Sequence, residues 1–386
     1  MTPESERLRA LIREEIERDG PIPFRRFMER ALYAPKLGYY TGGRTKIGKD
    51  GDFFTSLDLH PVFGHLVAAQ IIEMSAAIPT GPYTVVEVGA GKGLLALDLL
   101  RTIQAAAPDL FARLRYTIID VSPDLIQRQK KVLEGFSDRV NWASDVAEID
   151  GFDGVVVSNE LVDSLPHHQV VMTGEGLREV FVRTAEDGFQ EVLQAPSSPE
   201  IEACLQHLGI TLAPGYRTEV NLDALAWVRR VGRALGRGHV LTIDYGYPGD
   251  VYYQSDRKKG TFLCYHRHHA SEDPYSRVGL QDMTAHVDFS SLARAGREVG
   301  LEPVGFTDQC HFLVGLGITR LMETVLKRDG GDPGKSDEFR AMRRLMDPGG
   351  MGKAFKIMVQ EKGVKSPVLS GLAFPALSVH DLFPNG

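Results

Sequence analysis

The fold is decided by the stretch Val85-Val86-Glu87-Val88-Gly89-Ala90-Gly91-Lys92-Gly93. An apolar, β-branched run there reaches an acidic residue, alternating glycines follow, and a helical pattern continues from Leu94 to Ile103. Glycine lets the backbone turn sharply and lets a ligand approach closely, while the first N–H groups of the following helix point at that ligand. The stretch therefore predicts a nucleotide-type ligand held at a strand-to-helix turn. The alternative is a glycine-rich turn that binds nothing.

Details of this glycine loop distinguish between classes of ligand. A dinucleotide-binding loop has a third glycine three residues after the second, and here Leu94 occupies that place. A phosphate-binding Walker loop has Ser or Thr after Gly-Lys, and here Gly93 follows. Glu87 precedes the first glycine and suits a ligand with a cationic amino-acid end, such as S-adenosylmethionine. The predicted contacts of this ligand in the loop are Glu87, Gly89, Ala90, Gly91 and Gly93.

The next two strands carry acidic residues at their carboxyl ends. The run Tyr116–Val121 contains Asp120, and an acid at a strand end can accept hydrogen bonds from ribose hydroxyls. A further strand, Arg139–Ala143, leads to Asp145, which is predicted to accept a hydrogen bond from the adenine amino group. The alternative for Asp145 is a solvated turn residue. The predicted cofactor contacts in this part of the chain are Asp120, Val121, Ser122, Asp145 and Val146.

The predicted chemistry lies after the fourth strand, Gly154–Ser158. In a doubly wound sheet the end of this strand lies next to the reactive end of the ligand. Glu160 and Asp163 fall on one face if the chain forms a helical turn there, and the two carboxylates would hold a cationic nucleophile in line with a methyl group. Asn159 is assigned to both cofactor binding and catalysis. The alternative is an Asn helix cap with acids that complement the helix dipole.

Several segments, spread over most of the chain, resemble the MidA family, also called the mitochondrial complex I assembly methyltransferase family. The glycine loop alone fits any class I methyltransferase, whereas the first and last segments named below are typical of this family. Leu57 departs from the family pattern, which commonly has Pro there, and Asp120 stands where many members have Glu. The most specific segments are Gly51-Asp52-Phe53-Phe54-Thr55-Ser56, Asn159-Glu160 with Asp163, Ile243-Asp244-Tyr245-Gly246 and Thr284-Ala285-His286-Val287-Asp288-Phe289.

The resemblance implies an α/β fold of the class I methyltransferase type, Rossmann-like, with a seven-stranded, mostly parallel sheet. It also implies S-adenosyl-L-methionine as cofactor and, as in eukaryotic members, an arginine of a respiratory complex I core subunit as methyl acceptor. Thr55 and Ser56 are expected to contact the cofactor, with Phe53 and Phe54 as a covering lid. Two alternatives stay open, a small-molecule methyltransferase and a non-catalytic S-adenosylmethionine-binding assembly factor. A nicotinamide oxidoreductase is disfavoured by Leu94.

The order of patterns along the chain predicts its organisation. Residues 1–80 form a helical N-terminal region, and residues 81–166 form the cofactor-binding half. Residues 167–236 are an insert with a hairpin and helices, and residues 237–386 complete the methyltransferase domain. The polar segment 247–287 reads as a long loop that contacts substrate. The predicted substrate residues at its borders are Tyr245, His286 and Asp288.

Composition limits the classes of function. A chain of 386 residues with 43% hydrophobic residues can bury a large core, and its net charge of −7 argues against general nucleic-acid binding. No apolar run reaches membrane-spanning length, and no clear transit peptide is seen, so we expect a cytoplasmic protein, or a mitochondrial one if eukaryotic. Cys264 with the histidines that follow lacks a second ligand cluster, so no metal is expected. The sequence leaves the oligomeric state open, with a homodimer as one option.

Overall fold

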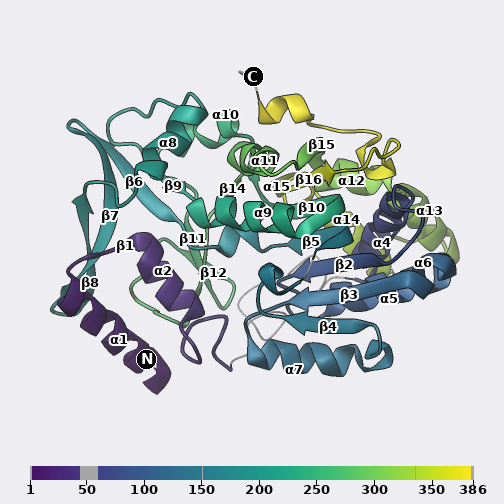
Figure 1. Cartoon of the computed structure of the whole chain (residues 1–386), viewed down its shortest axis with the longest axis horizontal. Coiled ribbons are helices and arrows are strands. Elements are labelled where there is room, and N and C mark those ends of the chain that lie inside the picture. Colours follow the sequence, from purple (N-terminus) through teal and green to yellow (C-terminus); the bar gives the residue numbers. More distant parts are fainter. Residues whose placement is uncertain (1, 44–59, 150, 335, 384–386) are drawn as a thin grey trace.

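The computed structural model describes residues 2–43, 60–149, 151–334 and 336–383. Its centre is a mixed, mostly parallel sheet with the strand order β15-β16-β10-β5-β2-β3-β4, and the short strand β14 pairs with β10 (Figure 1). The predicted α/β fold of the class I methyltransferase type is therefore confirmed, with β14 added to the seven expected strands. The strands are β2 (Tyr83–Val88), β3 (Leu114–Ile119), β4 (Val140–Ala143), β5 (Phe152–Asn159), β10 (Leu235–Tyr247), β14 (Val287–Asp288), β15 (Glu302–Asp308) and β16 (Phe355–Lys362).

The direction of the strands sets where a ligand can bind. β2 pairs in parallel with β3 on one side and with β5 on the other, so their carboxyl ends meet at one edge. β2 is buried along its whole length, which agrees with its run of β-branched residues and with cover on both faces. β16 lies between β10 and β15 and is antiparallel to both. The strand order reverses beside β2, where open α/β sheets bind ligands.

Helices cover both faces of the sheet and supply its two apolar cores (Figure 1). One core is formed with α4 (Val62–Ser75) and α5 (Leu94–Ala106), and the other with α9 (Leu222–Ala234) and α11 (Phe289–Arg297). α9 thus packs on the main sheet although it follows the predicted insert hairpin. The other helices near this sheet are α6 (Pro108–Arg113), α7 (Pro123–Val132), α12 (Gln309–Gly315), α13 (Ile318–Arg328), α14 (Asp337–Leu345) and α15 (Met351–Ala354), with short 3-10 turns η1 (Glu134–Phe136), η2 (Val146–Glu148), η3 (Val162–Ser164), η5 (Ser370–Leu372) and η6 (Val379–Leu382).

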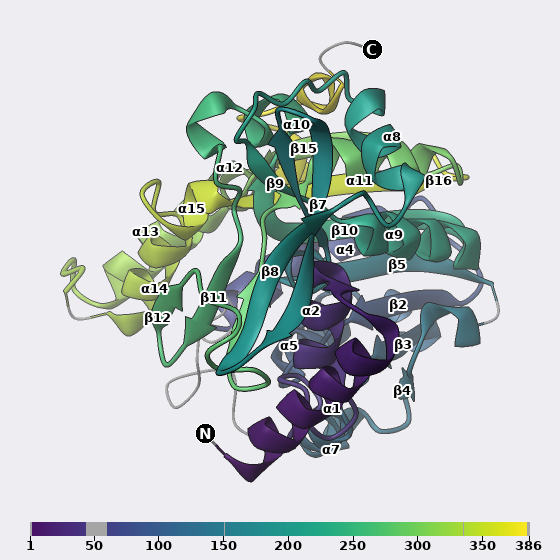
Figure 2. The ribbon, with the colours of Figure 1, turned by 90° about the vertical axis from the view of Figure 1, so that its left-hand side faces the viewer.

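A second layer combines the start of the chain with the predicted hairpin. Helices α1 (Pro3–Asp19) and α2 (Phe24–Tyr33) lie beside a smaller sheet in the order β1-β7-β6-β9, with β8 paired to β7 (Figure 2). Arg25 of α2 makes a bidentate ion pair with Asp223 of α9, at 2.7 and 3.1 Å, which joins this layer to the main sheet. The other elements here are β1 (Ile22–Pro23), β6 (His168–Thr173), β7 (Gly176–Ala185), β8 (Gly188–Gln194), α8 (Pro199–His207) and β9 (Arg217–Val220).

The segment 247–287 differs from the predicted long loop. It contains α10 (Gly249–Tyr252), η4 (Ser255–Arg257) and a small antiparallel sheet in the order β12-β11-β13. These strands are β11 (Leu263–His266), β12 (His269–Ser271) and β13 (Asp282–Thr284). Each is only three or four residues long, too short for a repeating polar and apolar pattern to show in the sequence.

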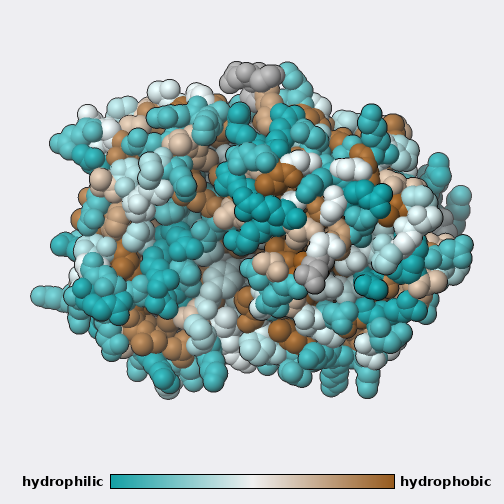
Figure 3. Space-filling model, in the orientation of Figure 1, coloured by the Kyte–Doolittle hydropathy of each residue, from teal (hydrophilic) through white to brown (hydrophobic). Residues whose placement is uncertain are grey.

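The length and apolar content of the helices, and the polarity of the surface, decide whether a chain could cross a membrane. Among the described residues, no helix is both long enough and apolar enough to cross a membrane. The face shown in Figure 3 is largely hydrophilic, and its apolar residues lie in small scattered groups. Scattered surface apolar residues are ordinary in a folded chain and indicate no site by themselves.

Candidate functional site

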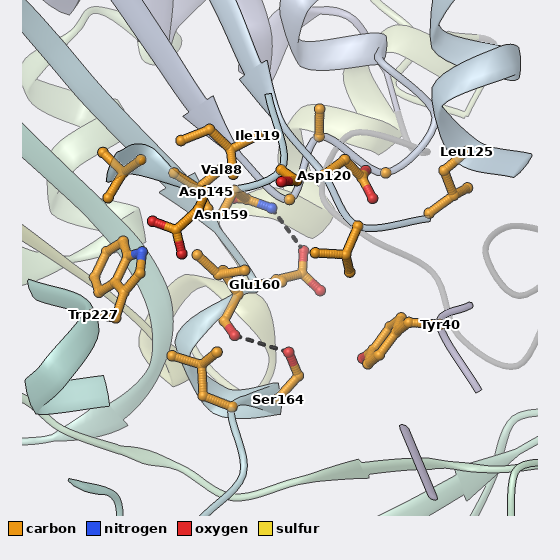
Figure 4. A pocket seen from close by; sticks show the side chains of 18 of the residues that line it. Tyr40, Val88, Ile119, Asp120, Leu125, Asp145, Asn159, Glu160, Ser164 and Trp227 are labelled. Carbon is orange, nitrogen blue, oxygen red and sulfur yellow. Dashed lines mark hydrogen bonds between the residues drawn. The ribbon is translucent and has the colours of Figure 1, made fainter. Parts of the chain in front are cut away.

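A cavity of about 270 Å³ lies at the carboxyl ends of β2, β3, β4 and β5 (Figure 4). Most of the residues predicted for the cofactor line it, together with side chains from α2, α9 and the segment after α2. The lining residues are Tyr33, Tyr40, Val88, Gly89, Ala90, Gly91, Lys92, Leu94, Ile119, Asp120, Val121, Leu125, Ser144, Asp145, Val146, Asn159, Glu160, Leu161, Ser164, Leu165, Trp227 and Arg230.

The glycine loop forms one wall of this cavity. Gly89, Gly91 and Gly93 have φ angles of 73°, 52° and 80°, in the left-handed region that only glycine adopts without strain. Gly93 is the N-terminal cap of α5 and does not line the cavity itself. A Cβ atom at Gly89 would lie 2.9 Å from Cδ1 of Leu161, across the loop. Gly89 therefore has no room for a side chain, and the bare backbone of the loop can approach a ligand closely.

Asp120 lines the cavity and is held by its neighbours. Its Oδ1 accepts a hydrogen bond from the backbone N–H of Ser122 at 2.9 Å, and its Oδ2 accepts one from Nε2 of Gln129 at 2.7 Å. Nε2 of Gln129 also donates to the carbonyl of Gly91 at 2.9 Å, while Oε1 accepts from Nε1 of Trp142 at 3.0 Å. One buried amide thus ties the predicted ribose carboxylate to the glycine loop.

Two predicted cofactor residues lie behind the cavity wall. Glu87 is buried in β2, accepts a 2.7 Å hydrogen bond from the Tyr116 hydroxyl, and has its pKa raised to about 7 by burial. Neither Glu87 nor Ser122 lines the cavity, and Ser122 caps α7 instead. Their direct contact with a cofactor stays a prediction. The sequence pattern located these residues beside the loop but could not show which side chains face inward.

The far end of the cavity combines Asp145 with residues of α9. Oδ1 of Asp145 accepts the backbone N–H of Ala147 at 2.8 Å, and Nε of Arg230 lies 3.9 Å from Oδ2. Trp227 packs beside them, with Val146 on the same wall. The sequence analysis missed Trp227 and Arg230, because nothing in the helical pattern of α9 shows which strand end it covers.

The end of β5 delivers Asn159 and Glu160 to the middle of the cavity. Nδ2 of Asn159 donates to Oε1 of Glu160 at 3.1 Å (Figure 4). Within the described part of the chain, the buried Oδ1 of Asn159 has no hydrogen-bond partner. Glu160 has a φ angle of 52°, and the helical turn begins only at Val162. The helical turn predicted over residues 159–165 is therefore wrong at its beginning, because the observed turn excludes Asn159 and Glu160.

This difference separates the two predicted catalytic acids. Glu160 lines the cavity, whereas Asp163 is buried beside Asp244 and Asp282 and does not line it. Burial, followed by the neighbouring carboxylates, raises the pKa of Asp163 well above its ordinary value. Asp163 therefore does not share one exposed helical face with Glu160, which corrects the predicted arrangement.

Asp244, which belongs to the family segment Ile243–Gly246, anchors this connection. Its Oδ2 accepts the backbone N–H groups of Leu161 and Val162 at 3.1 and 2.8 Å, and its Oδ1 accepts that of Tyr245 at 2.9 Å. Burial raises the pKa of Asp244, and these amide donors oppose the rise. The Asp244 side chain, from β10, thus fixes the backbone of the two residues that follow Glu160.

Two tyrosines from the N-terminal layer complete the cavity near Glu160. The rings of Tyr33 and Tyr40 are stacked, with centroids 5.4 Å apart. The Tyr40 hydroxyl donates to Oδ1 of Asp282 at 2.7 Å, and the Tyr33 hydroxyl donates to the carbonyl of Ser164 at 3.1 Å. The sequence analysis missed both as site residues, although Tyr40 belongs to a glycine- and aromatic-rich segment.

The predicted substrate residues lie outside the cavity. The ring of Tyr245 is tilted against Phe355, with centroids 4.0 Å apart, and is stacked with His286, whose pKa is lowered to about 4 by burial. Asp288 caps α11, accepts the backbone N–H of Ser291 at 3.1 Å, and also accepts the Tyr253 hydroxyl at 3.2 Å. These bonds give Asp288 a structural role. Contact of the three residues with substrate stays a prediction.

The predicted roles of Phe53, Phe54, Thr55 and Ser56 concern residues that lie outside the described part of the chain. Among the residues that are described, no cluster of three or more His, Cys, Asp or Glu side chains could hold a metal ion.

The chemistry of the cavity fits S-adenosylmethionine. The glycine loop offers backbone to the ligand, Asp120 offers carboxylate oxygen to ribose hydroxyls, and Asn159 has a buried acceptor oxygen without a partner in the described chain. Acceptors of this kind suit an ammonium group and hydroxyls. The fit rests on these side chains and on the space that the glycines leave.

Comparison with known proteins agrees. A family model described as "Putative S-adenosyl-L-methionine-dependent methyltransferase" matches residues 66–307. A crystal structure from Burkholderia thailandensis, described as a "likely methyl transferase" with S-adenosyl-homocysteine bound, is 35% identical, with a TM-score of 0.88 and 97% of each chain covered.

Curated relatives extend the comparison to eukaryotes. The Homo sapiens protein arginine methyltransferase NDUFAF7, mitochondrial, is 29% identical over 88% of this chain and 80% of its own length. Its Xenopus tropicalis counterpart is 27% identical over 95% and 89%. These relatives are named as mitochondrial, so the expected cytoplasmic location is not supported. The chain belongs to this family of S-adenosyl-L-methionine-dependent methyltransferases, which confirms the resemblance to the MidA family.

Proposed function

We propose that this methyltransferase modifies an arginine side chain of a protein. The observation that carries the proposal is the placement of Glu160 in the lining of the cofactor cavity, to which the stacked rings of Tyr33 and Tyr40 also belong. A planar cation can stack on a tyrosine ring and donate two N–H bonds to a carboxylate. The curated relatives carry the same activity in their names.

The charges around Glu160 favour a cation. Burial first, and then the nearby acids Asp244, Asp282 and Glu160, raise the pKa of Asp163, so these four acids lie close together. Glu160 also raises the pKa of Tyr245, after the larger effect of burial. An arginine guanidinium stays protonated near neutral pH, and Glu160 is the one of these four acids that lines the cavity, so its carboxylate would attract and orient the guanidinium.

The roles of the residues follow from these positions. S-adenosylmethionine supplies an electrophilic methyl group. Glu160 would orient the guanidinium and stabilise its positive charge, while Asn159 holds the Glu160 carboxylate and Asp244 accepts the backbone N–H of the next residue, Leu161. Most of the acceleration in such a transfer comes from alignment, with electrostatics second.

The test uses the whole chain and labelled cofactor. Purified protein is incubated with methyl-labelled S-adenosylmethionine and extract from cells that lack it, and labelled protein is hydrolysed to identify the modified amino acid. Labelled methylarginine supports the proposal, and sequencing of the labelled polypeptide tests whether the acceptor is the complex I core subunit that the family resemblance implies. Label in small molecules only, or no label despite cofactor binding, contradicts it.

A further inference from the structure

We propose that Trp227 recognises the adenine base of the cofactor by donating its indole N–H to a ring nitrogen. Trp227 belongs to α9, outside the strand ends that hold the rest of the predicted cofactor contacts. The inference concerns selectivity for the base and does not depend on which group accepts the methyl.

The indole N–H of Trp227 is a buried donor that no described residue accepts. Trp227 is 5% exposed and lines the cofactor cavity. Its Nε1 has no hydrogen-bond partner within the described residues. In Figure 4 the ring nitrogen lies on the edge that faces Asp145. A buried N–H without a partner lowers stability, so a ligand that accepts this bond regains that free energy on binding.

The pair formed by Trp227 and Asp145 matches one edge of adenine. An indole only donates, and an ionised carboxylate only accepts. Adenine carries an amino donor and ring nitrogens that accept, so Asp145 would accept from the amino group while Trp227 donates to a ring nitrogen. A base with a carbonyl in place of the amino group would present an acceptor to Asp145, which is unfavourable.

The position of Trp227 is fixed by contacts outside the cavity. Asn221 caps α9 by accepting the backbone N–H of Ala224 at 2.9 Å, and it donates to the carbonyl of Leu165 at 3.1 Å. Arg230, one turn after Trp227, lies 3.9 Å from the Asp145 carboxylate. The N–H of Trp227 and the carboxylate of Asp145 are therefore both held in position before the ligand binds.

Calorimetry with atom-edited ligands tests the bond. The affinities of S-adenosylhomocysteine and of its 1-deaza, 3-deaza and 7-deaza analogues are measured on the full chain and on Trp227→Phe. We expect Trp227→Phe to weaken S-adenosylhomocysteine about 10-fold, and one deaza analogue to lose a similar factor on the unaltered chain. That analogue should lose nothing further on Trp227→Phe, because the bond is already absent.

Two results would overturn the proposal. If every analogue loses the same factor in affinity, relative to S-adenosylhomocysteine, on Trp227→Phe as on the unaltered chain, then no ring nitrogen depends on Trp227. Deaza analogues that all bind the unaltered chain as tightly as S-adenosylhomocysteine would do the same, even if Trp227→Phe failed to fold. Trp142→Phe serves as the matched control, because the Trp142 indole already donates to Gln129 and its loss should leave the deaza penalties in place.

Discussion

At the scale of single residues, Glu160 shows how backbone conformation sets chemistry. Its φ angle of 52° is uncommon for a residue with a side chain and costs of the order of 1 kcal/mol. The surrounding bonds hold it there, since its own N–H donates to the carbonyl of Ile243 at 3.0 Å. This left-handed backbone conformation places Glu160 in the cavity lining, whereas Asp163 lies outside that lining.

Replacing Glu160 with Gln should separate binding from transfer. The variant keeps the size of the side chain and an oxygen for the Asn159 amide, but it loses the charge that orients a cationic acceptor. We expect methyl transfer in the labelled extract to fall on the order of 100-fold. The affinity for S-adenosylhomocysteine, measured by calorimetry, should change by less than about 3-fold. Loss of cofactor binding in the folded variant would contradict this division of roles.

His167 should make the fold sensitive to acid. Its side chain is fully buried between Phe24 and Phe262, and burial lowers its pKa to about 3. The unfolded chain has a histidine pKa near 6.5, so it binds a proton that the folded chain refuses between these values. The stabilising contribution is complete above pH 6.5 and is lost as pH falls toward 3, by up to about 1.4 kcal/mol per pH unit.

The comparison that isolates this effect uses His167→Leu, which cannot titrate. Free energies of unfolding are measured in urea from pH 7.5 to 4.5 for both proteins. Their difference should shift in favour of the variant as pH falls below 6.5. A constant difference over this range would show that His167 takes up its proton in the folded chain as readily as in the unfolded one.

Among the elements, the connection from β5 to η3 depends on a side chain from β10. Replacing Asp244 with Asn exchanges one accepting oxygen for a donor and leaves a backbone N–H facing it. We expect the free energy of unfolding to fall by about 1–3 kcal/mol and methyl transfer to fall with it. Asp308→Asn is the matched control, because Asp308 is also buried and accepts a backbone N–H, that of His311 at 2.9 Å, but makes no bond to the connection from β5 to η3. Equal transfer rates in both variants would refute a special role for Asp244.

Helix α7 should influence cofactor affinity through Gln129. Gln129→Leu removes both the bond to Asp120 and the bond to the Gly91 carbonyl. We expect S-adenosylhomocysteine to bind about 10-fold more weakly, measured by calorimetry. Gln127→Leu makes the same chemical change at an exposed position of the same helix and should have no such effect. A similar loss of affinity in both variants would show that any such change in α7 weakens binding, and that the two Gln129 bonds have no special role.

Elements with a clear period were predictable, and side-chain placement was not. β2, β3, β5 and α5 follow from β-branched runs and apolar spacing, and Asp120, Asp145 and Glu160 follow from their places after strands. Tyr33, Tyr40 and Trp227 reach the cavity from helices and segments far away in the sequence, so only tertiary packing reveals them. The family resemblance implied a seven-stranded, mostly parallel sheet, but the order of its strands was not predicted, since the residues alone do not state which strands pair.

At the scale of the whole molecule, the cavity lies between two layers. Tyr33 and Tyr40 come from the N-terminal layer, while the other walls come from the main sheet and α9. Hydrogen exchange should therefore detect ligand binding in both layers. With S-adenosylhomocysteine, amides of residues 33–40, 88–97 and 227–230 should exchange more slowly. Protection confined to the main sheet would show that the N-terminal layer does not close on the ligand.

The place of β16 has a consequence for how the chain is made on the ribosome. β10 ends at Tyr247, yet its neighbour β16 begins about 100 residues later, at Phe355. At about 5–20 residues per second, the growing chain waits about 5–20 s before that strand exists. During this interval one edge of β10 has no partner, although Leu241 and Ile243 are fully buried in the finished fold. Chaperone supply during synthesis should therefore govern the yield of folded protein.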